Sequence, residues 1–245
     1  PGTLRLAAAL VLVALPSAAL ERLEFQVSGT DESLSEAARV ASSVRSLHEE
    51  GFDDPQDLLA AARSDYAGIL AALYAKGHYS AIIHILIDGR EADSIPALEV
   101  PASIDTIAIR VDPGPPFRFG AASVAPLAAD TELPQGFRRG GVAESGLVAE
   151  ALDASILAWR NKGHAKAELA AEDVLADHRT ATLDVGLRIE PGPKLRFGRL
   201  EVEGEQRMRE ARVRKIAGLP EGQTFSDTEL RRAENRLRRT GIFAS

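Results

Sequence analysis

One eight-residue segment occurs twice in this chain, and this repeat constrains the fold more than any other feature. Residues 113–120 read PGPPFRFG and residues 191–198 read PGPKLRFG, a shift of 78 residues with six of eight positions identical. The same shift brings residues 162–164 (KGH) onto residues 240–242 (TGI), and a shift of 86 brings residues 76–78 (KGH) onto 162–164. The chain is therefore built from three copies of one unit.

A helix is predicted in each copy immediately before the repeated glycine. Apolar residues recur at helical spacing over residues 59–73, 147–159 and 230–237. Asp54 and Pro55 are typical of an N-cap and a first helical residue, and Ser226 with Glu229 forms a capping box. We expect the glycines that follow these helices to adopt the left-handed conformation of a C-terminal cap: Gly77, Gly163 and Gly241.

Strands are predicted around these helices. The first strand of each copy is expected at residues 23–27, 117–124 and 195–203, and the last two at 79–87 and 107–111 in copy one and at 165–174 and 183–189 in copy two. An earlier helix is expected at residues 33–47 and 208–216, and a short one at 130–141, where Pro134 and three glycines oppose it. The order is strand, helix, helix, strand, strand, and copy three stops before its last two strands.

The Pro-Gly-Pro segments predict the boundaries between copies, because proline removes a ladder donor and glycine permits positive φ. We expect Pro113 with Gly114, and Pro191 with Gly192, to end one unit and begin the next. The predicted fold class is α+β, in tandem small modules at residues 20–112, 113–190 and 191–245, the third incomplete.

The first 19 residues resemble a secretory signal. Arg5 precedes an apolar run over residues 6–15, and Pro16 is followed by the small residues 17–19. The run is about half the ~20 residues that span a bilayer, so a permanent transmembrane helix is the weaker interpretation. A buried N-terminal helix and an uncleaved anchor remain alternatives.

Composition and motifs argue against several functional classes. The chain has no cysteine, one tryptophan and a formal charge of −7, which excludes thiolate chemistry and opposes nucleic-acid binding. His78 and His164 share a repeat position, but copy three has Ile242 there, so we predict structural roles and no catalytic or metal site. His48, His84 and His178 show no ligand spacing, and no cofactor is expected. Trp159 falls on the apolar helix face and is predicted to pack in the core.

These features together resemble POTRA domains, the polypeptide-transport-associated modules of bacterial outer-membrane assembly proteins. The element order, the helix-ending glycine, the Pro-Gly-Pro-x-x-Arg-Phe-Gly turn and the signal carry the resemblance, which is to TamA-like members of the BamA/TamA superfamily. It implies a periplasmic scaffold attached to the outer membrane by a β-barrel absent from this chain. The implied partners are a TamB-like inner-membrane-anchored protein, nascent outer-membrane protein clients and that barrel. BamA-like proteins, two-partner secretion transporters and a secreted enzyme with a site between repeats remain alternatives.

The resemblance further implies that the second strand of each module lies at a sheet edge, where a partner strand can add. Copy one offers the more apolar edge, with the candidate residues Tyr79, Ile82, Ile83, Ile85 and Ile87. The equivalent strand of copy two, at residues 165–174, is rich in Ala and Glu and is expected to be the poorer template.

Positive charge gathers at the C-terminal end. Residues 205–245 contain ten Lys and Arg against six acidic residues. We expect Arg231, Arg232, Arg238 and Arg239 to form a basic surface on the membrane side, facing anionic head groups or the barrel. The alternative is a pair of solvated helix faces.

Overall fold

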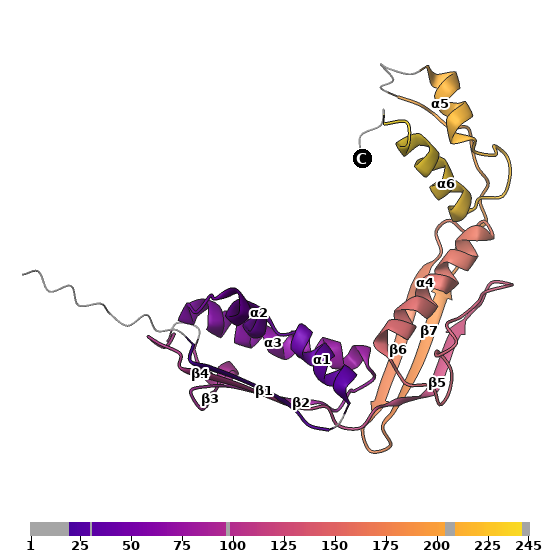
Figure 1. Cartoon of the computed structure of the whole chain (residues 1–245). Helices are drawn as coiled ribbons and strands as arrows, with labels where there is room; N and C mark the ends of the chain where they lie inside the picture. The colour runs from indigo at the N-terminus through magenta and orange to yellow at the C-terminus, as the bar shows by residue number, and fades with distance from the viewer. Residues whose placement is uncertain (1–19, 30, 97–98, 204–208, 242–245) are drawn as a thin grey trace, which may run out of the picture. The chain divides into compact units, whose positions relative to one another are not determined.

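The structure is a computed structural model that describes residues 20–29, 31–96, 99–203 and 209–241 (Figure 1). The chain divides into two compact units. The first contains residues up to Ala72 together with Ile82–Asp112, and the second contains Leu73–Ala81 and the chain from Pro113 onward. Helices and mixed sheets occur in the predicted alternation, so the α+β fold class is confirmed.

The first unit is built on a four-stranded sheet. Its strands are β1 (Arg22–Val27), β2 (Ile82–Ile87), β3 (Arg90–Glu91) and β4 (Thr106–Asp112), in the order β1-β4-β2-β3. β1 is parallel to β4, and the other neighbours are antiparallel. The side chains of Ile107, Ile109 and Val111 alternate into the core from the central strand β4, as a half-buried strand requires.

Three helices lie on one face of this sheet: α1 (Glu32–Val40), α2 (Ser43–Glu50) and α3 (Pro55–Ala75) (Figure 1). A short 3₁₀ helix, η1 (Ala92–Ser94), follows β3. The prediction of one continuous helix over residues 33–47 is wrong. The chain breaks at Ala41 and Ser42, because the Ser42 side chain accepts a hydrogen bond from Arg45 N and starts a new helix as its N-cap.

Asp65 of α3 holds this helix break in place, although no sequence pattern singled it out. Its fully buried carboxylate accepts hydrogen bonds from Ser42 Oγ at 2.5 Å, Ser43 N at 2.6 Å and Val44 N at 3.3 Å. Burial raises the pKa of Asp65, and these hydrogen bonds offset part of that rise. The carboxylate therefore satisfies the first amides of α2 from a neighbouring helix.

The second unit has a three-stranded sheet of order β5-β7-β6. Its strands are β5 (Arg118–Ala125), β6 (Glu168–Asp177) and β7 (Thr182–Glu190), with β5 parallel and β6 antiparallel to β7. Helix α4 (Ser145–Asn161) packs on this sheet over a core that includes Phe117, Phe119 and Leu187. Trp159 packs against this core, which confirms its prediction.

Copy two has no helix at residues 130–141, where a short one was expected. The segment has turns and bends joined by residues of irregular structure. Pro134 removes a helix donor, and a Cβ at Gly136 would lie 2.6 Å from Leu147 Cδ1, so Gly136 leaves room for that side chain. These turns take the place of a helix, and Phe137 from this segment packs in the same core as Leu147 of α4.

Copy three contributes two helices to the second unit, α5 (Glu210–Ala217) and α6 (Asp227–Arg238). The strand predicted at residues 195–203 is wrong: it forms only an isolated bridge, between Arg196 and Thr224. In copies one and two the first strand pairs in parallel with the last, β4 or β7. The described residues of copy three contain no such strand for it to join.

The repeated glycines build the same joint twice within the second unit. Gly77 has φ of 82° and its carbonyl accepts from Phe117 N at 2.8 Å. Gly163 has φ of 106° and its carbonyl accepts from Leu195 N, also at 2.8 Å. The expected positive φ is confirmed at both positions and at Gly241, where φ is 66°.

The repeated histidines and the Pro-Gly-Pro turns belong to the same joint. Nδ1 of His78 donates to Gly114 O at 3.0 Å, and Nδ1 of His164 donates to Gly192 O at 2.8 Å. Both turn glycines have positive φ, 63° at Gly114 and 67° at Gly192. Pro113 and Pro191 precede these glycines. The Lys-Gly-His and Pro-Gly-Pro motifs therefore recur together because, in each copy of the joint, the histidine of one motif binds the glycine of the other.

The arginine of the repeated turn also has a repeated contact. Arg118 Nη1 donates to Gly140 O and Arg196 Nη1 donates to Gly222 O, both at 2.8 Å. Each arginine thereby fixes the loop that leads into the next helix, α4 or α6. Among the described residues no helix is both long and apolar enough to cross a membrane.

Candidate functional site

The candidate edge strand β2 begins later than its sequence pattern suggested. It runs from Ile82, so Tyr79 lies outside it. Tyr79 Oη donates to Ala143 O at 2.8 Å, and its ring stacks on Tyr74 with centroids 4.7 Å apart. Burial, with Tyr74 nearby, raises the pKa of Tyr79 to about 12. Tyr79 therefore packs in the second unit and is not an edge residue, which corrects its assignment.

The expectation that β2 is an edge strand holds for part of its length. The strand β4 pairs with one side of β2, and the two-residue strand β3 pairs with the other side at Leu86 and Ile87. Ile82–Ile85 are the residues of β2 that lack a second neighbouring strand in the described sheet. The open part of this apolar edge is therefore shorter than the strand predicted at residues 79–87.

Side chains also cover part of the remaining edge, at Ile85. Glu91 Oε1 accepts from Ile85 N at 3.2 Å, and Tyr66 Oη lies 3.4 Å from Ile85 O while donating to Glu91. A carboxylate and a phenol therefore occupy the positions that an added strand would use. His84 Nδ1 lies 3.2 Å from the other oxygen of Glu91.

The pKa values reflect this cluster. Burial raises the pKa of Tyr66 to about 12, and the neighbouring Glu91 carboxylate contributes to the rise. Burial also acts to raise the pKa of Glu91, but hydrogen bonds from Tyr66 and Ile85 N and the neighbouring His84 outweigh it and lower that pKa. Glu91 thus stays an ionised acceptor over the edge.

Alternation along β2 identifies what stays open. Asp88 N donates to Thr106 O, so even-numbered residues face β4 and odd-numbered residues face outward. Ile83, Ile85 and Ile87 therefore direct their backbone groups to the edge. Since β3 covers Ile87 and Glu91 covers Ile85, Ile83 is the open position of β2.

The strand β6 has the longer open edge. It spans ten residues at the end of its sheet, and no described strand pairs with its outer side. Val174 and Leu175 are 52% and 67% exposed. The prediction that this strand is the poorer template rested on its composition alone, and its place in the sheet makes it the more accessible edge.

The outward positions of β6 follow from the pairing of β7. Arg118 N donates to Ala181 O, so odd-numbered residues of β7 face β5 and even-numbered residues face β6. The β6 residues opposite those even positions, such as Asp173 and Leu175, pair inward. Glu172, Val174 and Ala176 therefore direct their backbone N–H and C=O outward.

A shallow hollow lies on the β5-β7-β6 sheet beside this edge. Its volume is about 330 Å³, and its lining includes Ala121, Ser123, Asp173, Leu175, Asp184 and Gly186. The small residues on β5 and β7 leave room there, and Asp173 and Asp184 make the rim acidic. A side chain of a strand added to β6 has space to enter it.

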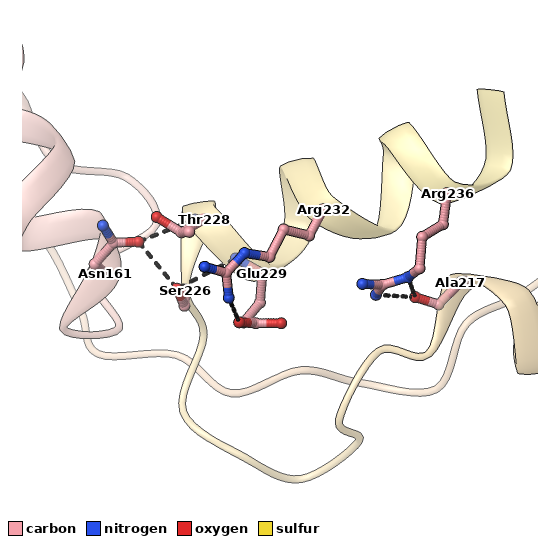
Figure 2. A network of polar contacts seen from close by, with 7 residues as sticks. All are labelled: Asn161, Ala217, Ser226, Thr228, Glu229, Arg232 and Arg236. Atoms are coloured by element: carbon pink, nitrogen blue, oxygen red, sulfur yellow. Dashed lines mark hydrogen bonds and ion pairs between the residues drawn. The ribbon is translucent and has the colours of Figure 1, made fainter. Parts of the chain in front are cut away.

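The predicted basic surface separates into two parts on α6. Arg231 pairs with Asp227, and Arg232 pairs with Glu229 at 2.6 Å, as Figure 2 shows for the second pair. Arg238 and Arg239 are exposed at the end of α6, and their side chains have no ion-pair partner among the described residues. The four arginines therefore do not act as one uniform patch.

Another arginine of α6 has a structural role that the sequence did not indicate. Arg236 Nε donates to Ile216 O and to Ala217 O at 3.1 Å (Figure 2 draws the bonds to Ala217). These carbonyls lie at the C-terminal end of α5, where the helix has no amide left to satisfy them. Arg236 therefore ties α5 to α6.

Within the described ranges, no group of three or more His, Asp or Glu side chains is placed to hold a metal ion. His84 lies beside Glu91, and His48 lies 3.9 Å from Asp53. His178 packs edge to face on Phe117. The histidines are thus spread over separate contacts, and they form no shared site in this part of the chain.

Comparison with known proteins gives a family for part of the chain. Residues 195–245 match the POTRA family model, described as surface antigen variable number repeat. No curated protein matches the chain. A solved structure with a similar fold is that of Haemophilus influenzae BamA POTRA3-5. Its TM-score is 0.57 at 15% sequence identity, and the match covers 93% of this chain and 87% of that one.

Two further solved structures are similar at a lower level. The N-terminal domain of Omp85 from Thermosynechococcus elongatus and POTRA1-3 of Omp85 from Anabaena both have a TM-score of 0.37, with 15% and 13% identity. The first covers 93% of this chain and 87% of its own, and the second 93% and 86%. Similarity of fold is therefore concluded from the Haemophilus structure alone among these three. The match to the POTRA family model covers residues 195–245.

Proposed function

We propose that this chain is a periplasmic polypeptide-binding scaffold of an outer-membrane protein assembly or translocation machine. The POTRA match, the fold shared with the BamA modules and the repeated joints support this assignment. Such modules bind other polypeptides through their backbone, which needs no catalytic group. The bound partner or client adds a strand to an exposed sheet edge.

The observation that carries the proposal is the open outer edge of β6. Glu172, Val174 and Ala176 direct backbone groups there that pair with no strand of the described sheet, and the neighbouring hollow leaves room for side chains. Backbone hydrogen bonds supply affinity without reading sequence, and the hollow supplies selectivity. The candidate residues Ile82, Ile83, Ile85 and Ile87 of β2 form a second, mostly covered edge, with Ile83 as its open position.

The finer assignment that we propose is a TamA-like protein. It includes a cleaved signal at residues 1–19, three modules, a following β-barrel in the outer membrane and a TamB-like partner. A BamA-like insertase and a two-partner secretion transporter are the alternatives within this class, and a secreted enzyme is the alternative outside it. Counting the modules in the full-length gene product separates the first three.

Cysteine mapping tests strand addition at β6. The chain has no native cysteine, so an introduced residue is its single thiol. We place it at Glu172, Val174 or Ala176 and add an unfolded outer-membrane β-barrel protein whose own single cysteine is moved along one strand. Strand addition predicts disulfides in a fixed register, with the client position moving by two when the β6 position moves by two. Yields without a register, or equal to those from Glu150 on α4, contradict the proposal.

A proline variant tests the backbone contact itself. Val174→Pro removes an outward N–H, and Val174→Ala keeps that N–H while shortening the same side chain. We expect client binding to fall for the proline variant and to persist for the alanine variant, with both remaining folded by circular dichroism. Equal binding by both folded variants argues against backbone pairing at this edge.

A further inference from the structure

A groove between α4 and α6 has no role in strand addition. Its volume is about 520 Å³, and it is lined from α4 by Ile156, Leu157 and Arg160 and from α6 by Arg231, Arg232 and Asn235. Both helices belong to the second unit. The groove therefore lies within one compact part of the chain.

The contacts at one end of the groove fix the two helices to each other. Asn161 Oδ1 accepts from Ser226 Oγ at 2.9 Å and from Thr228 N at 3.0 Å (Figure 2). The last residue of α4 thereby satisfies an amide at the start of α6. Ser226 also accepts from Glu229 N as the N-cap of α6, so the groove begins at a defined hydrogen-bonded corner.

The lining of the groove includes an exposed apolar side chain. Leu157 is 41% exposed on α4. It also lines a second hollow of about 310 Å³ on its other side, next to Ala154 and Ala158. A leucine between two hollows loses water contact when a partner side chain covers it, which favours binding.

The charge of the lining is positive, with Arg160, Arg231 and Arg232 against Asp153. Arg231 and Arg232 each have an ion pair on their own helix, yet a guanidinium has five N–H donors and both side chains are more than 60% exposed. Donors therefore remain for a ligand.

Arg160 adds a third guanidinium to the groove lining. Its Nη2 donates to Ala167 O at 3.1 Å, which anchors the side chain, and its Nε is buried away from the groove. A guanidinium has five N–H donors, so further donors of Arg160 remain for a carboxylate in the groove.

We infer that this groove binds an acidic segment of a partner polypeptide, with an apolar residue on Leu157 and carboxylates on Arg160, Arg231 and Arg232. Charge complementarity favours an acidic ligand, because the groove lining is cationic although the whole chain carries a formal charge of −7. The groove is separate from the β6 edge, so the loss of either binding activity leaves the other to be measured.

A peptide probe tests the inference on the full chain. The probe is a fluorescein-labelled helical peptide of about 16 residues, with leucines at i and i+4 flanked by glutamates. Its controls replace every glutamate with lysine, or both leucines with serine. We expect fluorescence anisotropy to show binding of the acidic peptide that weakens with salt, and clearly weaker binding of both controls.

Matched charge reversals locate the site. Arg231→Glu with Arg232→Glu should weaken peptide binding about tenfold or more. Arg209→Glu with Arg212→Glu makes the same charge change at the N-cap and first turn of α5, away from the groove lining, and should change binding less than about twofold. Leu157→Ser should also weaken it. Trp159 fluorescence and circular dichroism verify folding, and Arg231→Gln with Arg232→Gln replaces the reversal if it unfolds.

Three outcomes overturn the inference. One is equal loss of binding in the two double reversals, which indicates a nonspecific charge effect. Another is equal binding of the acidic and lysine peptides. The third is a groove variant that loses binding to anionic vesicles and keeps peptide binding, which assigns the arginines to lipid.

Discussion

The two sheets of this protein treat their exposed edges in opposite ways. The apolar strand β2 (IIHILI) is covered by β3 and by Glu91 with Tyr66, so Ile83 is its open position. The charged strand β6 (ELAAEDVLAD) is open along its outer side in the described sheet. The strand with the stronger β-forming sequence is the one that is protected.

The physical reason is the aggregation risk of an apolar edge. Unpaired backbone groups beside exposed apolar side chains pair with any extended chain, whereas acidic side chains such as Glu172 and Asp173 restrict which strands approach. On β6 these acidic side chains stand beside the exposed Val174 and Leu175, so charge restricts the approach of other strands while the edge stays open. Accessibility of an edge thus depends on what covers it, and apolarity of the strand is a poor guide.

The largest expected effect tests whether the two units are stabilised separately. Asp65→Ala leaves Ser42 Oγ, Ser43 N and Val44 N without their acceptor in the first unit, and we expect a loss of about 2–4 kcal/mol. Trp159, the single tryptophan, lies in the second unit and reports on that unit alone. In urea, circular dichroism should show an early transition while Trp159 fluorescence keeps its parental midpoint.

The control for this experiment is Asp57→Ala, at an exposed position in the first turn of α3. It should change the midpoint far less. If Asp65→Ala shifts the fluorescence and dichroism midpoints together, the two units unfold as one, and the expectation that they are stabilised separately is wrong.

The next effect is the reciprocal one, in the second unit. A Cβ at Gly163 would lie 2.7 Å from Thr224 Cγ2 and 2.9 Å from Lys194 Cγ, at a φ that L residues avoid. Gly163→Val should therefore cost about 1–3 kcal/mol and lower the midpoint of Trp159 fluorescence. Gly163→Ala should cost less, on the order of 1 kcal/mol. A melt of Gly163→Val that matches the parent would contradict the repeated joint.

A smaller effect concerns the cover over β2. Glu91→Gln removes the carboxylate that contributes to the raised pKa of Tyr66, so that pKa should fall from about 12 toward its ordinary value. Because the pKa of Tyr79 is also about 12, the ultraviolet titration of the phenolates is recorded in a Tyr79→Phe background, where the difference between Glu91→Gln and its parent reports on Tyr66. Glu99→Gln, an exposed position outside the cluster, serves as the control, and an unchanged Tyr66 titration in Glu91→Gln would show that burial alone sets the value.

The same tyrosine gives a stability change with pH whose sign is fixed. Folded Tyr66 keeps its proton to a higher pH than the unfolded chain, so its contribution is complete below about pH 10 and is lost as pH rises toward 12. Glu91→Gln should make this loss shallower. Denaturation midpoints across that range, compared between variant and parent, provide the measurement.

The smallest expected effect concerns the basic end of the second unit. If Arg238 and Arg239 face anionic head groups, the chain without residues 1–19 should bind anionic vesicles better than neutral ones. Binding should weaken with salt, because the Debye length is only about 8 Å at physiological ionic strength. Arg238→Ala with Arg239→Ala should reduce it modestly in a vesicle co-sedimentation assay. Equal binding to both vesicle types leaves these arginines as solvated side chains.

The order of elements was readable from the sequence, because each signal for it is local. Helix starts at Pro55 and Asp227 follow from caps at Asp54 and Ser226, whose side chains bond amides two or three residues ahead. The left-handed glycines and the alternating strands β4 and β7 depend equally on a few neighbouring residues. A repeat that shows these signals at a fixed spacing reinforces each of them.

The covered edge of β2, the break between α1 and α2 and the groove between α4 and α6 depend on tertiary structure. The contacts that form them join residues far apart in the chain. Tyr66 meets Glu91 across 25 positions and covers β2, and Asp65 meets Ser42 across 23 and divides a helix that looked continuous. Asn161 meets Ser226 across 65 and shapes the groove. No periodicity encodes such pairs, since each depends on which faces the folded helices and strands bring together. The repeated helices and glycine turns were readable from the sequence by itself, and packing determined which edge and which groove are open.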